Sequence, residues 1–98
     1  NDPLFTQKAI SILEGKMDKK ALIASKPVTV SEDFSVYGEA GIPAAMLFLG
    51  SVSEKRLTKL KSQNKLPSLH SSRYYPDAEE TLAFGIQAMS GIVEGLLQ

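Results

Sequence analysis

The stretch Ala44-Ala45-Met46-Leu47-Phe48-Leu49, closed by Gly50, decides which fold class this sequence predicts. An unbroken apolar run of this length is typical of a strand that is buried on both faces of a helix-covered sheet. Two weaker segments precede it, Ala21-Leu22-Ile23-Ala24 and Val28-Thr29-Val30. Both are too brief for helices, and the second is rich in β-branched residues. We therefore expect strand or extended structure in all three segments, with the 44–49 run as the strongest strand.

Two helices are predicted on the N-terminal side of this run. Asp2-Pro3 has the residue types of an N-cap and a first helical position, and apolar residues then recur at helical spacing over about 3–14. Ser31 is a second N-cap candidate, ahead of a helix over about 32–40 that Gly41 would end.

Two more helices are predicted after the run. Ser53 precedes a lysine-rich stretch that indicates a short surface helix over about 54–63. Asp77 and Glu80 have capping-box spacing ahead of a long helix over about 78–97. The apolar positions of this last helix are Leu82, Ile86, Met89, Val93 and Leu96. Small residues occupy its other flank, so we expect this helix to be buried on most sides.

These elements together predict an α/β fold, with residues 1–98 forming one segment of a helix-covered mixed sheet. The composition, 43% apolar and 22% charged, fits one small soluble domain. The chain begins at Asn1 inside a helix-cap pattern and not at a methionine, so we expect it to be a piece of a longer protein.

Charge and cysteine content narrow the range of partners. Eleven basic and eleven acidic residues leave no net charge, so neither nucleic acid nor an anionic membrane is an expected partner. No apolar run approaches the length of about 20 residues that spans a bilayer. The absence of cysteine agrees with a cytoplasmic origin without demonstrating one.

His70 is the only histidine of the chain and lies in a predicted loop over 65–76. A neutral imidazole can bind a metal ion, but a transition metal usually takes about four ligands from His, Cys, Asp or Glu. Considered alone, a loop histidine is more often solvated or hydrogen-bonded. If His70 does bind metal, most of the site must lie elsewhere.

Other polar groups have simpler structural explanations. Ser31-Glu32-Asp33-Phe34 is explained as a helix cap with two acids at the helix N-terminus, although its expected place after a strand is also where α/β proteins bind ligands. Asp77, Glu79 and Glu80 could be metal-binding or acid–base carboxylates, but capping alone accounts for Asp77 and Glu80. Arg73 could bind a carboxylate or anchor the loop, and the sequence leaves both open. A further group of basic residues is expected to face water: Lys55, Arg56, Lys59, Lys61 and Lys65.

Several motifs occur in an order that resembles a known family. The motifs are Asn1-Asp2-Pro3, Ser31-Glu32-Asp33-Phe34, Gly41-Ile42-Pro43 leading into Leu47-Phe48-Leu49-Gly50, Leu69-His70-Ser71, and Leu82 with Gly85. Together they resemble the C-terminal part of the catalytic domain of the two-metal amidohydrolases and peptidases that include hippurate hydrolase, aminoacylase and auxin-conjugate hydrolase. The resemblance covers nearly the whole chain.

The resemblance implies a function and a role for one residue. His70 would correspond to the family's last metal ligand, while the other ligands and the glutamate general base would belong to the N-terminal half of the catalytic domain. The implied cofactor is a pair of divalent metal ions, zinc or manganese, and the implied substrate is a small N-acyl amino acid or peptide. The rest of the catalytic domain is the implied partner, and the parent protein would resemble the family's homodimers. We expect the 98-residue chain alone to be inactive.

Two residues depart from the family pattern, which often has glycine where Val30 stands and proline where Ser72 stands.

A second class of function also stays open. In it, the chain is a noncatalytic binding or assembly module whose last helix docks on a partner through its apolar flanks.

Overall fold

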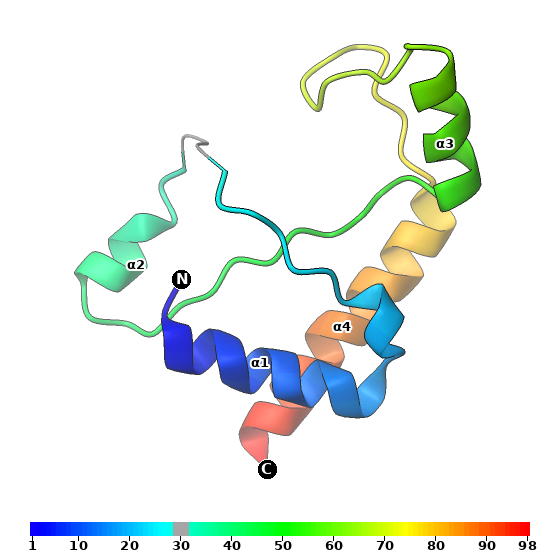
Figure 1. Ribbon diagram of the computed structural model, residues 1–98. Coiled ribbons are helices and arrows are strands. Elements are labelled where there is room, and N and C mark those ends of the chain that lie inside the picture. The colour runs from blue at the N-terminus through cyan, green and yellow to red at the C-terminus, as the bar shows by residue number, and fades with distance from the viewer. Residues whose placement is uncertain (29–31) are drawn as a thin grey trace. The chain divides into compact units, whose positions relative to one another are not determined.

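The computed structural model describes residues 1–28 and 32–98, and within these ranges it contains helices and no strand (Figure 1). The elements in chain order are α1 (Pro3–Lys16), the 3₁₀ helix η1 (Lys19–Ala21), α2 (Ser35–Glu39), α3 (Glu54–Ser62) and α4 (Ala78–Leu97). The residues divide into two compact units, one of Asn1–Leu47 with Ala88–Gln98 and one of Phe48–Gln87.

The predicted α/β sheet is wrong for the described residues. Among residues 1–28 and 32–98 the 44–49 run has no strand partner, and the backbone groups of this run form hydrogen bonds with these residues at two positions, Ala44 and Met46. The Asp2 amide donates to the Ala44 carbonyl at 2.7 Å, and the Asn1 side chain bonds the amide and carbonyl of Met46 at 2.8 and 3.0 Å. A strand needs a ladder of such bonds along its length, and apolar composition alone does not supply one.

The two weaker segments, predicted to be strand or extended structure, form no strand in the described residues, although the Leu22 backbone is extended. Ala21 belongs to η1, and residues 22–28 form no regular element. Thr29 and Val30 lie outside the described residues, as does the predicted cap Ser31.

The first unit is built on the packing of α1 against the C-terminal half of α4. Asp2 caps α1 by accepting a hydrogen bond from the Phe5 amide at 2.7 Å, and Pro3 is the first helical residue, as predicted. The helix continues to Lys16, past the predicted end at Gly15. An ion pair of 2.8 Å between Lys16 and Glu94 joins the two helices.

The core of this unit is small. Its buried residues are Ala9, Leu13 and Ile92, and Met17, Leu22, Ala88 and Leu96 pack against them partly buried. Within α4 only Gly91 and Ile92 are buried, so the predicted burial of this helix on most sides is wrong. Leu82, Ile86, Met89 and Val93 are each at least half exposed.

Helices α2 and α3 end in the same way. Gly41 has φ +74°, and the Ile42 amide donates to the Tyr37 carbonyl at 2.9 Å. Asn64 has φ 51°, and the Lys65 amide donates to the Leu60 carbonyl at 2.9 Å. Both are left-handed Schellman-type ends, in which glycine or asparagine is favoured. They confirm the predicted stops of these two helices.

Within the described ranges, no helix combines the length and apolar character that crossing a membrane requires.

Candidate functional site

His70 lies in the connection between α3 and α4, inside the second unit. The connection leaves α3 at Asn64 and reaches α4 at Asp77, and the His70 side chain is exposed. Two consecutive turns contain and follow it: the Ser71 amide donates to the Ser68 carbonyl at 3.0 Å, and the Tyr74 amide donates to the Ser71 carbonyl at 2.9 Å. The imidazole is therefore carried on a turn, where it is accessible to a ligand.

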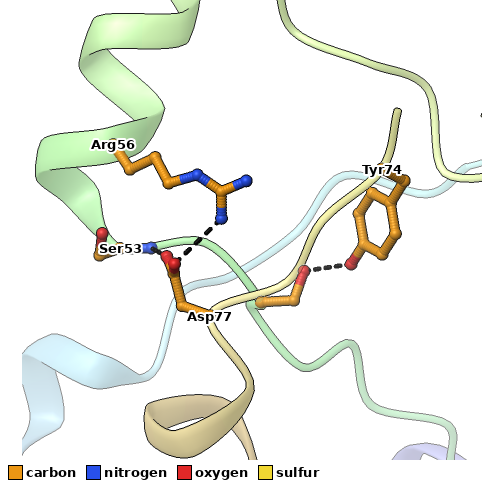
Figure 2. A network of polar contacts seen from close by, with 5 residues as sticks. Ser53, Arg56, Tyr74 and Asp77 are labelled. Carbon is orange, nitrogen blue, oxygen red and sulfur yellow. Dashed lines mark hydrogen bonds and ion pairs between the residues drawn. The ribbon is translucent and has the colours of Figure 1, made fainter. Parts of the chain in front are cut away.

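The end of this loop is bonded to the segment that precedes α3. The Tyr74 hydroxyl forms a hydrogen bond with the Ser51 hydroxyl, and the Asp77 amide donates to the Ser51 carbonyl at 2.8 Å. Figure 2 shows the Tyr74 contact beside the polar contacts of Asp77. The loop that carries His70 is thus closed by contacts with residues more than 20 positions earlier.

Asp77 is the centre of these contacts. Its carboxylate accepts a hydrogen bond from the Ser53 amide at 2.7 Å and one from the Arg56 guanidinium at 2.9 Å (Figure 2). The Ser53 backbone hydrogen bond, together with the nearby Arg56 charge, lowers the pKa of Asp77 below its ordinary value. The Arg56 guanidinium also lies 5.1 Å from the centre of the Tyr75 ring, a cation–π geometry.

The Asp77 side chain does not form the capping box that the sequence predicts for α4. The Asp77 carboxylate bonds to Ser53 and Arg56, so it caps α3 and not its own helix. Ser53 is the N-cap of α3, but no hydrogen bond from its side chain serves the cap. The Asp77 carboxylate therefore accepts a hydrogen bond from the Ser53 amide at the start of α3.

The residues in the described ranges do not by themselves fit a two-metal centre. Among residues 1–28 and 32–98, no three side chains of His, Cys, Asp or Glu converge as metal ligands would. The exposed imidazole of His70 suits the part of a single ligand. The remaining ligands of any such site would have to come from other polypeptide.

The residues of the Ser31-Glu32-Asp33-Phe34 motif lie in the first unit, apart from Ser31, which is not described. Glu32 and Asp33 are exposed ahead of α2, and the Phe34 ring meets the Tyr37 ring edge-on at 5.3 Å. Phe34 and Ser35 line an open hollow of about 380 Å³ together with Asp2, whose carboxylate is already engaged in capping α1.

The remaining candidates are mostly solvated. Glu79, Glu80 and Arg73 are exposed. The lysines predicted to face water are exposed, namely Lys55, Lys59, Lys61 and Lys65, whereas Arg56 is half-buried in the contacts with Asp77 and Tyr75.

The pairing of Ser51 with Tyr74, and of Ser53 and Arg56 with Asp77, could not be predicted from the sequence. The partners are 21 to 24 positions apart, and no local pattern marks a serine hydroxyl or an arginine for such a contact. The sequence feature that drew attention to this region was the length of the loop, since a connection of this length is often functional.

Comparison of the chain with protein-family models, with characterised proteins and with solved structures finds no match.

Proposed function

We propose that this chain is the C-terminal part of the catalytic domain of a metal-dependent amidohydrolase or peptidase, which hydrolyses the amide bond of N-acyl amino acids or small peptides. The observation that carries the proposal is the exposed His70 imidazole on an anchored turn, within the ordered motifs described above. The helical structure adds no support from fold, so the proposal rests on the motifs and on the accessibility of His70.

The proposed role of His70 is that of one metal ligand. In such a site the metal ions would polarise the amide carbonyl and activate a water molecule. The contribution of this chain is narrower: the imidazole offers one nitrogen lone pair, and its other nitrogen is available for an orienting acceptor. Catalysis would then require residues supplied by the rest of the parent protein.

The uncovered apolar surface agrees with a parent protein of this kind. Eighteen large hydrophobic residues are exposed among the described residues, whereas only Ala9, Leu13 and Ile92 are buried hydrophobics. Each exposed side chain forgoes about 25 cal/mol for every Å² of apolar surface left in water. Contact with the rest of a catalytic domain would recover part of that free energy.

The first test is the coding sequence upstream of Asn1. We expect it to encode a His-x-Asp pair and adjacent glutamates, which would supply the missing ligands and the general base. A start codon directly before Asn1 would contradict the proposal.

The second test compares two variants of the full-length protein, His70→Ala and Ser72→Ala. Both residues are exposed in the same loop, so both substitutions should leave the fold intact. We expect His70→Ala to lose bound zinc or manganese, measured by elemental analysis, and to lose hydrolysis of a panel of N-acyl amino acids. Ser72→Ala should retain both.

The 98-residue chain alone should bind zinc weakly in calorimetry, because one imidazole lacks converging ligands. Tight, stoichiometric binding that depends on His70 would contradict this.

A noncatalytic binding or assembly module is the second candidate. It is favoured by the exposed apolar residues of α4: Leu82, Ile86, Met89, Val93 and Leu97. If full-length protein that retains these residues binds no metal and hydrolyses none of the panel, this second candidate replaces the first.

A further inference from the structure

The backbone of the apolar run over 44–49 follows a path without turns. Neither a turn nor a bend occurs between Ile42 and Gly50. In an extended backbone, the amide and carbonyl of one residue point to the same edge, and those of the next residue point to the opposite edge. The even-numbered residues of the run therefore present these groups at one edge, and the odd-numbered residues present theirs at the other.

The even-numbered edge is occupied by the first two residues of the chain. The Asp2 amide donates to the Ala44 carbonyl at 2.7 Å. The Asn1 side chain accepts from the Met46 amide at 2.8 Å and donates to the Met46 carbonyl at 3.0 Å, so it takes the place of one residue of a neighbouring strand. All three bonds fall on even-numbered residues, as the alternation of an extended backbone requires.

The odd-numbered edge is open. The amides and carbonyls of Ala45, Leu47 and Leu49 form no hydrogen bond with residues 1–28 or 32–98. We call these three residues the free edge. Leu47 and Leu49 are 43% and 45% exposed, and Phe48 between them is 63% exposed, so another chain can reach this part of the run. An open, uncharged, apolar edge of this kind is a template for pairing with a further strand.

The free edge has two properties that its partner must match. Its unused backbone groups require another extended backbone, and its uncharged side chains require an apolar segment. A second copy of this chain offers both. A two-fold axis beside Leu47 would place the two Leu47 residues opposite each other, and Ala45 of each copy opposite Leu49 of the other. Residues paired in this way in antiparallel strands exchange two hydrogen bonds.

Charge also favours a second copy. A two-fold contact places a segment opposite itself, so any charged residue near the axis would face its own like charge. The run over 44–49 contains no charged residue, and the contact therefore brings no such repulsion.

We propose that the free edge pairs with the free edge of a second copy of this chain, as two antiparallel strands. The contact joins two chains and adds no strand pairing within either one, and it needs neither a metal ion nor the proposed function. Two paired strands alone are only marginally stable in water. Burial of the apolar side chains of the run against the other copy supplies the rest of the driving force.

The first test measures amide hydrogen exchange by NMR in the 98-residue chain at several concentrations. We expect the amides of Ala45, Leu47 and Leu49 to exchange about tenfold more slowly as the concentration rises, because pairing hydrogen-bonds them. The Phe48 amide is the internal control, since it points to the other edge and should keep its rate.

Two results of this measurement would overturn the inference. Slow exchange of the free edge at every concentration would show that these amides have a partner within one chain. An equal slowing at Phe48 and at the free edge would show association without strand pairing. If a synthetic peptide of alternating valine and threonine slows the same amides while the chain stays monomeric, the free edge takes another extended peptide, and a second copy is the wrong partner.

The second test compares Leu47→Pro with Phe48→Pro. Proline has no amide hydrogen, so the first variant loses a donor at the free edge and the second loses one at the opposite edge. Neither amide is hydrogen-bonded within the described ranges, so both variants should keep the helical circular dichroism of wild type. Leu47→Pro removes a donor from both copies at the two-fold axis, and we expect the dimer dissociation constant in sedimentation equilibrium to rise about tenfold or more.

Phe48→Pro should raise this dissociation constant much less, although it also loses an apolar side chain. Equal effects of the two prolines would mean that the pairing does not use the odd-numbered edge, and the inference would be wrong. A chain that stays monomeric at all concentrations would overturn it as well.

Discussion

Asp77 accepts hydrogen bonds from the N-terminal ends of two helices, α3 and α4. Its carbonyl accepts the Thr81 amide of α4 at 3.0 Å, while its carboxylate accepts the Ser53 amide at the start of α3 and the Arg56 guanidinium. A negative charge at a helix N-terminus is favoured by the exposed amides and by the helix dipole. At the residue scale, this explains why the carboxylate is held more strongly in its charged form than an isolated one.

Asp77 should therefore make the stability of the second unit depend on acid pH. Because its folded-state pKa lies below the ordinary value of 3.8, its contribution is present above that value and is lost as the pH falls through the lower folded-state pKa. We expect Asp77→Asn to lower the urea midpoint at pH 7, measured by circular dichroism, and to shrink the loss of stability between pH 5 and pH 2.

Glu79→Gln is the comparison variant, since Glu79 is an exposed acid in the first turn of α4, where it interacts with the helix dipole but does not bond to α3. It should lower the midpoint at pH 7 less than Asp77→Asn does. The explanation fails if Asp77→Asn and wild type show the same midpoint at both ends of this pH range. Glu94, whose pKa is lowered by Lys16, should contribute to acid sensitivity in the same direction but from the other unit.

At the scale of elements, helix positions could be predicted from the sequence and strands could not. Asp2-Pro3 and Gly41 act through contacts within a few residues, so their effects are readable locally. The apolar run 44–49 predicts burial but carries no information on a hydrogen-bonding partner, and in the described residues no strand forms. The hydrogen bonds of Asp77 with Ser53 and of Tyr74 with Ser51 were missed for the same reason, because they depend on residues distant in sequence.

Close packing between α1 and α4 gives a prediction at this scale. A β-carbon added at Gly95 would lie 2.6 Å from Cγ2 of Ile12 and 2.9 Å from two further atoms of that side chain. We expect Gly95→Ala to destabilise the first unit by about 1–3 kcal/mol through overpacking. This cost exceeds the gain in helix propensity of about 0.5–1 kcal/mol. Urea unfolding followed by circular dichroism measures the change.

Gly15→Ala is the matched control, because Gly15 also lies in the last turn of its helix but has no atom within 4 Å of an added β-carbon. It should stabilise the chain by about 0.5 kcal/mol. If both substitutions stabilise equally, the approach of Ile12 to Gly95 is not a tight contact in solution.

At the scale of the whole molecule, burial is unusually sparse. The described residues bury Ala9, Leu13 and Ile92, and leave 18 large hydrophobic side chains exposed. A monomeric domain of this size usually buries most of its unfolded surface, so this chain has apolar surface available for contact. The candidate site could likewise be predicted only in part. The sequence predicts that His70 lies in a loop, but no local feature shows which other groups would complete a metal centre.

The exposed apolar side chains should also determine the association state of the chain in solution. We expect the 98-residue chain to self-associate, with a weight-average mass that rises with concentration in sedimentation experiments, because exposed apolar side chains gain free energy on mutual burial. Ile86→Glu should reduce the association, since this side chain is 66% exposed on α4 and a buried unpaired charge would oppose contact. Thr58→Glu, an exposed polar position on α3, should leave it unchanged. A stable monomer at all concentrations would instead favour an independent module, because its exposed residues would then be compatible with isolated existence.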